Sequence, residues 1–174
     1  MPVTARRTSL LRAVNSGFFF LATRISSIHD ALVRLGQRAV RQWSTLIVLS
    51  DCDDRPSELL VTALVRARLC ELATEARGGD ADCAFTVGLF SVVDAFMDAP
   101  MEEIVARLPF ADEVAAALLR REGDHGAVLA ATVDYEGGRF DTAEARLQDV
   151  PLRGFYLDAV RYAEHTSGSL AALR

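Results

Sequence analysis

Hydrophobic positions recur along this chain at spacings of three and four residues, which is the period of an α-helix. No run of five residues alternates between apolar and polar positions with β-branched enrichment, so no strand is predicted. We therefore expect an all-α fold, a single compact multi-helix domain over residues 1–174. The predicted helices cover residues 9–14, 27–36, 40–49, 56–77, 84–97, 100–109, 112–121, 126–135, 141–147 and 155–164.

The stretch 84–97 is apolar almost all round, which predicts a central and buried helix. Ser91 and Asp94 are its polar exceptions, and their spacing of three places them on one face. Because a buried carboxylate is costly unless it is paired, Asp94 is expected either to form a buried polar pair, with an arginine for example, or to face a groove. Structural pairing is favoured over catalysis.

All 19 basic residues are arginine, and the formal net charge is −5 at pH 7. This acidic balance argues against DNA and against non-specific nucleic-acid binding, which depends on positive potential. Arg34, Arg38 and Arg41 recur at helical spacing, and guanidinium groups can contact phosphates or bases. We favour a solvated helix face for these three, with nucleotide or partner contact as the alternative.

The three cysteines, Cys52, Cys70 and Cys83, form no Cys-x-x-Cys motif, so neither a disulfide framework nor a zinc site is expected. A reducing cytoplasm fits this usage best. Residues 6–24 imitate a secretion signal, but polar residues interrupt the apolar stretch. No stretch approaches the length of a membrane span, so no membrane partner is expected.

Catalytic motifs are missing from the sequence: there is no G-x-S-x-G, no phosphate-binding glycine loop and no clustered histidine. His29-Asp30 matches the His-Asp dipeptide of metal-dependent phosphohydrolases, but no histidine precedes it and Asp30 fits a helix-capping position. His125 and His165 lie far from it in sequence. We expect no metal and no cofactor.

Six ordered segments resemble the HDOD domain, in the version that follows an EAL domain in bacterial cyclic di-GMP signalling proteins. The resemblance covers about residues 9–165. The segments are LLRAVNS at 10–16, ISSIHDAL and LG within 25–36, RQW at 41–43, ALVRARLCEL at 63–72, AFTVGLFS at 84–91 and LLRREG at 118–123.

The resemblance implies a helical fold related to HD hydrolases whose catalytic ligands have been lost. A catalytic relative would carry His-Asp where this chain has Ser91 and Val92. It also implies an output module that acts by contact with a protein partner or by self-association, with no EAL domain in this chain. The expected function is therefore non-catalytic signalling. Two alternatives stay open: a divergent metal-dependent phosphohydrolase, and a nucleotide receptor that uses surface arginines.

Overall fold

A computed structural model of the chain describes residues 57–108, 110–148 and 150–171. Within these ranges the secondary structure is helical and no strand occurs, which confirms the predicted all-α class. The helices are α3 (Ser57–Ala76), α4 (Ala81–Phe90), α5 (Val93–Met97), α6 (Met101–Arg107), α7 (Asp112–Arg120), α8 (Gly123–Glu136), α9 (Phe140–Arg146) and α10 (Leu152–Ala171).

The chain divides into two compact units, one made of Met1–Arg55 with Glu164–Arg174 and the other of Pro56–Ala163. The features described below lie in Pro56–Ala163. The expectation of a single domain over residues 1–174 stays a prediction.

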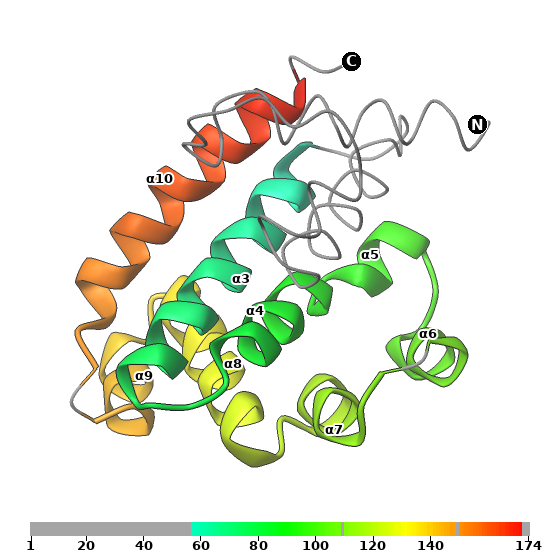
Figure 1. Ribbon diagram of the computed structural model, residues 1–174, viewed down its shortest axis with the longest axis horizontal. Helices are drawn as coiled ribbons and strands as arrows, with labels where there is room; N and C mark the ends of the chain where they lie inside the picture. The colour runs from blue at the N-terminus through cyan, green and yellow to red at the C-terminus, as the bar shows by residue number, and fades with distance from the viewer. Residues whose placement is uncertain (1–56, 109, 149, 172–174) are drawn as a thin grey trace, which may run out of the picture. The chain divides into compact units, whose positions relative to one another are not determined.

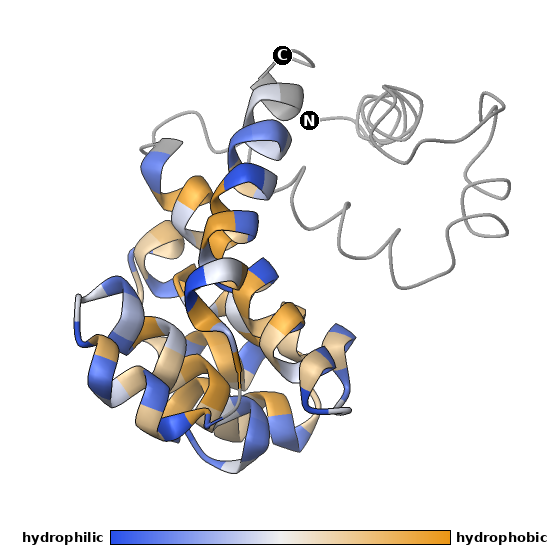
Figure 2. Ribbon diagram, turned by 90° about the vertical axis from the view of Figure 1, so that its left-hand side faces the viewer, coloured by the Kyte–Doolittle hydropathy of each residue, from blue (hydrophilic) through white to orange (hydrophobic). Residues whose placement is uncertain are grey.

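Helices α3, α4 and α8 form the centre of the unit Pro56–Ala163, with α5, α6 and α7 to one side in Figure 1 and α9 to the other. Hydrophobic residues gather where these central helices meet (Figure 2). The largest fully buried side chains are Leu64 and Leu69 of α3, Leu89 of α4 and Leu129 of α8. A helix buried on most of its sides is typical of a domain centre.

Tyr162 packs α10 against α3 and α4. Its ring meets Phe85 edge-on at 6.5 Å between centroids, and the guanidinium of Arg68 lies 5.7 Å from its centroid. Both geometries suit the quadrupole of an aromatic ring. The contact therefore fixes the middle of α10 on the helices that form the core.

The predicted helix boundaries hold at several points where a glycine, a proline or acidic residues mark the end of a helix. The longest predicted helix, 56–77, is observed as Ser57–Ala76 and ends before Gly78, whose φ of +73° suits glycine. Pro100 precedes α6, and the acidic first turns of α6 and α7 lie where the positive helix end favours them. The predicted helices 126–135 and 155–164 are longer than expected, since they extend to Gly123–Glu136 and Leu152–Ala171.

The predicted single helix over 84–97 is wrong, because the chain breaks into α4 and α5 at Ser91 and Val92. The Ser91 hydroxyl donates to the carbonyl of Gly88 at 2.7 Å, and the Ser91 N–H reaches the same carbonyl at 3.3 Å. Serine side chains that bond to nearby carbonyls compete with the helical ladder. The next residue, Val92, leaves helical geometry with φ −122° and ψ 11°.

Among the described residues, none of the helices combines the length and the apolar character that crossing a bilayer requires.

Candidate functional site

The crossing of α3 and α4 depends on Gly88. A Cβ atom at this position would lie 2.5 Å from the carbonyl oxygen of Arg66 and 2.6 Å from the Cα of Ala67. Both atoms belong to the backbone of α3, so no side chain can move aside to make room. Glycine therefore lets the two helix backbones touch. The close approach brings Ser91, which caps the C-terminal end of α4, beside Arg66.

Arg66 links Ser91 to Glu136 across three helices. Its Nη1 donates to the Ser91 hydroxyl at 3.3 Å, and its Nε donates to the Glu136 carboxylate at 2.8 Å. The side chains of Arg66 and Glu136 are each only 17% exposed. Burial raises the pKa of the Glu136 carboxyl, and the charge of Arg66 partly offsets that rise. We call Arg66, Ser91 and Glu136 the arginine network.

A second guanidinium contributes to the electrostatics around this network. Burial and the charge of Arg66 lower the pKa of Arg121. Arg121 Nη1 donates to the carbonyls of Ala117 and Leu118 at 3.4 and 3.3 Å in the last turn of α7, where the Ala117 carbonyl also accepts from the Arg121 N–H at 3.2 Å. The positive charge of Arg66 is therefore near a second positive charge as well as the carboxylate of Glu136.

The residues at the position expected for His-Asp do not fit a metal ion. The Ser91 hydroxyl already donates to Gly88 and accepts from Arg66. Val92 is 7% exposed and offers only a hydrocarbon side chain. Divalent metals at such sites take imidazole, carboxylate or thiolate ligands, and a neighbouring guanidinium repels a cation. The network holds a fixed cation of the chain at this position.

Asp94 does not form the predicted buried polar pair. The residue is exposed, and its carboxylate accepts from the backbone N–H of Ala95 at 2.9 Å. The break at Ser91 and Val92 is the physical reason, because residues three apart share a face only within one continuous helix. Ser91, the other polar residue of this stretch, accepts instead from Arg66 of α3.

Other predicted residues fall outside the described part of the chain. Arg34, Arg38 and Arg41 lie there, as does the dipeptide formed by His29 and Asp30.

Arg66 and Glu136 were not singled out from the sequence. They are 70 residues apart, and each looks like an ordinary charged residue of an amphipathic helix. The only local hint is Gly88, since a glycine within an apolar helical pattern often marks a close backbone approach.

A comparison with protein families shows to which family the chain belongs. The sequence profile of the HDOD domain matches residues 5–103, which include Gly88, Ser91 and Val92. The chain belongs to the HDOD family. The match extends over residues of both compact units.

Two relatives align with most of the chain. The chain is 37% identical over 155 residues to the cyclic di-GMP phosphodiesterase CdgJ of Vibrio cholerae, a match of 87% of this chain and 35% of CdgJ. It is 30% identical over 138 residues to the protein YuxH of Bacillus subtilis, a match of 76% of this chain and 34% of YuxH. The chain thus spans about a third of the length of these curated relatives.

The fold of this HDOD chain is also similar to that of a solved structure. A putative phosphohydrolase from Shewanella amazonensis superimposes with a TM-score of 0.64 at 13% identity, over 97% of this chain and 83% of that one. At this identity the likeness concerns the fold. It agrees with the all-α architecture expected from the relation between HDOD domains and HD hydrolases.

Proposed function

We propose that this HDOD chain is a non-catalytic output module of bacterial cyclic di-GMP signalling, which acts by contact with a protein partner or by self-association. The arginine network is the observation that carries the proposal. At the position where a catalytic relative would bind metal, the chain has a hydroxyl that donates to Gly88 and accepts from Arg66, and a buried valine. Arg66 supplies positive charge there without any open coordination position.

The link to cyclic di-GMP rests on the name of one relative, the phosphodiesterase CdgJ, of which the chain matches 35%. The remaining length of CdgJ is large enough to hold a separate catalytic domain, in keeping with the resemblance to HDOD domains that follow EAL domains. We assign the signalling link to this chain and not the hydrolysis. The free thiols of Cys70 and Cys83 support a reducing compartment, and we place the protein in the cytoplasm.

The first test measures turnover with the purified full chain. Cyclic di-GMP and bis-p-nitrophenyl phosphate are each incubated with Mn²⁺, Fe²⁺ or Mg²⁺, and no hydrolysis above the protein-free blank is expected. Glu136→Gln is the matched variant, because it removes a carboxylate of the network and keeps the shape of the side chain. Hydrolysis by the wild type that this variant abolishes would establish the divergent phosphohydrolase and overturn the proposal.

The second test measures association. Sedimentation over a range of protein concentrations reports self-association, and cross-linked affinity capture from the host followed by mass spectrometry reports partners. We expect either a concentration-dependent dimer or a partner that co-purifies stoichiometrically and rebinds after separate purification. A chain that stays monomeric and captures nothing would contradict the role of protein contact.

A further inference from the structure

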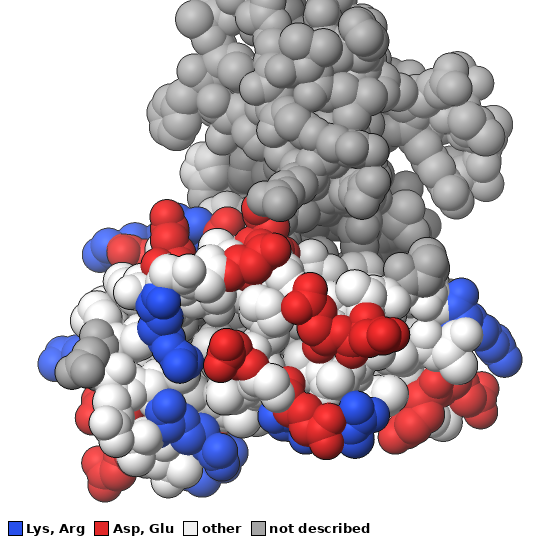
Figure 3. Space-filling view, turned by 60° about the horizontal axis from the view of Figure 1, so that its bottom comes forward, with Lys and Arg blue, Asp and Glu red and all other residues white. Residues whose placement is uncertain are grey.

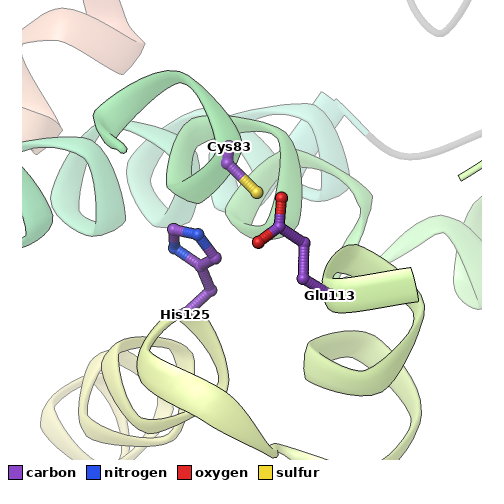
Figure 4. Close-up of side chains that lie close together, drawn as sticks. All are labelled: Cys83, Glu113 and His125. Atoms are coloured by element: carbon purple, nitrogen blue, oxygen red, sulfur yellow. The ribbon is translucent and has the colours of Figure 1, made fainter. Parts of the chain in front are cut away.

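Three side chains with metal-ligating groups meet at the starts of three helices. Cys83 lies in the first turn of α4, Glu113 in that of α7 and His125 in that of α8. Figure 4 shows the three side chains pointing toward one another. One ligand atom from each, the sulfur, a carboxylate oxygen and a ring nitrogen, lies within 4.8 Å of the other two. We call these three residues the Cys-Glu-His cluster.

Local backbone geometry brings the three helix starts together. Asp80 caps α4 by accepting from the N–H groups of Asp82 and Cys83, each at 3.2 Å, which fixes the first turn that carries the thiol. Between α7 and α8 the chain reverses through Arg121, which has a left-handed φ of 58°. A Cβ on Gly126 would lie 2.2 Å from the carbonyl carbon of Arg121, so only glycine allows the start of α8 to lie this close to the backbone of Arg121.

The donor set is the one that zinc prefers. Zn²⁺ binds thiolate sulfur at about 2.3 Å and imidazole nitrogen or carboxylate oxygen at about 2.0–2.2 Å, in tetrahedral geometry. Such a site places its ligand atoms about 3.5 Å apart. The observed limit of 4.8 Å is longer than that distance, so the three side chains would have to close in on a bound ion. The exposed Glu113 already bonds to the thiol of the half-buried Cys83, and His125 is half-buried as well.

One ring nitrogen of His125, Nδ1, is buried and forms no hydrogen bond with the described part of the protein. Buried polar atoms of this kind are rare in native structures and call for an explanation. A histidine that ligates a metal through one nitrogen and uses the other to bind water or protein is a frequent arrangement.

Charge around the cluster favours a cation. The first turns that carry the ligands also carry Asp82, Asp112 and Asp124, which offset the positive ends of the helices. Figure 3 shows groups of acidic side chains, with arginines between them, on one face of the molecule. Burial and the neighbouring carboxylate of Glu113 raise the pKa of the Cys83 thiol to about 11, so a bound metal ion would have to displace its proton.

We propose that Cys83, Glu113 and His125 bind one Zn²⁺ ion with an open fourth position for water or an exogenous ligand. The ion would join α4, α7 and α8 at their starts. The site is separate from the arginine network, because Cys83 and Ser91 are eight residues apart at opposite ends of α4, about 12 Å along a helix axis. The proposal is independent of the signalling role and requires no catalysis.

Co²⁺ serves as the spectroscopic probe. The full chain is stripped with a chelator, dialysed under reducing conditions and titrated with Co²⁺. We expect one equivalent to bind with intense visible bands of tetrahedral cobalt and a near-ultraviolet charge-transfer band from a single thiolate. Zn²⁺ should displace the cobalt stoichiometrically and raise the melting temperature of the wild-type chain, because an ion that binds only the folded state stabilises it.

Matched variants locate the site. Cys83→Ser should abolish the charge-transfer band, and Glu113→Gln and His125→Ala should each weaken zinc binding by more than about 100-fold, beyond the loss typical of residues that only orient ligands. Glu102→Gln is the control, since Glu102 is also an exposed glutamate in the first turn of a helix. Its affinity should match the wild type.

Other results would overturn the proposal. Failure of the stripped chain to bind Co²⁺ or Zn²⁺ excludes the site, and so does an octahedral spectrum without a thiolate band. A charge-transfer band that persists in Cys83→Ser and disappears in Cys52→Ser would assign the metal to a different thiol. A folded Glu113→Gln variant with wild-type affinity would remove the carboxylate from the ligand set.

Discussion

Gly88→Ala tests the contact on which the arginine network depends. The added methyl carbon would lie 2.5 Å from the Arg66 carbonyl oxygen, so the two helix backbones would have to separate by about 0.9 Å to restore ordinary contact at 3.4 Å. Overpacking costs about 1–3 kcal/mol, and a clash with backbone belongs at the upper end. Alanine recovers about 1 kcal/mol through its helix propensity. We therefore expect a net loss of about 2 kcal/mol.

Urea unfolding followed by circular dichroism measures this change. The midpoint should fall with an unchanged slope, and the melting temperature should drop by about 4–8 °C. Gly154→Ala is the control, because Gly154 lies in α10 and a Cβ there meets nothing within 4 Å. That variant should be stabilised by up to about 1 kcal/mol. A Gly88→Ala protein as stable as the wild type would refute the close crossing of α3 and α4.

Three further predictions concern the ion pair of Arg66, the buried thiol of Cys70 and the binding of cyclic di-GMP. Arg66→Met leaves the Glu136 carboxylate without its cation, and should lower the free energy of unfolding by about 2–3 kcal/mol at neutral pH. The pKa of Glu136 is already raised in the folded state and rises further without Arg66. The loss of unfolding free energy, measured with urea, should therefore be small in acid, where the carboxyl is protonated, and should grow as the pH rises through the folded pKa. A loss that does not depend on pH, or that is unchanged when Arg66→Met is combined with Glu136→Gln, contradicts the pairing. Cys70 is fully buried, burial raises the pKa of its thiol to about 12, and its sulfur lies 3.4 Å from the Thr132 hydroxyl, so a pulse of iodoacetamide should leave it unmodified by mass spectrometry until urea unfolds the chain. Cyclic di-GMP at high concentration should leave the melting temperature unchanged, and a saturable rise would favour the nucleotide-receptor alternative.

Sequence patterns predicted the helices well where a local signal marks their ends. Pro100 and the acidic first turns fixed the starts of α6 and α7, and Gly78 fixed the end of α3. The break of α4 was missed because a serine in an apolar helical stretch is common, and nothing local shows that its hydroxyl will bond to Gly88. The consequence was an incorrect face for Asp94.

The candidate sites were harder to predict because they depend on helix packing. The family resemblance indicated that Ser91 and Val92 occupy the position of the His-Asp pair. The hydrogen-bond partners of Ser91 could be identified only from the fold. Cys83, Glu113 and His125 lie 30 and 12 residues apart and match no ligand spacing. The absence of a Cys-x-x-Cys motif therefore argued against a zinc site formed by neighbouring residues. It gave no information about a site whose ligands come from three different helices.

A buried polar centre without a metal ion has to be satisfied by the side chains of the protein itself, since an unpaired buried charge or hydroxyl is costly. In this chain one side chain meets that need: Arg66 donates to the Ser91 hydroxyl and pairs with the Glu136 carboxylate. Its charge is part of the covalent chain and does not depend on metal supply. We infer that α3, α4 and α8 keep their arrangement at this end of α4 without a metal ion. The Arg66 cation belongs to α3 and lies at the end of α4, whereas the proposed zinc ion lies at the start of α4. Zinc binding therefore joins α7 and α8 to α4, while the arginine network holds α4 on α3.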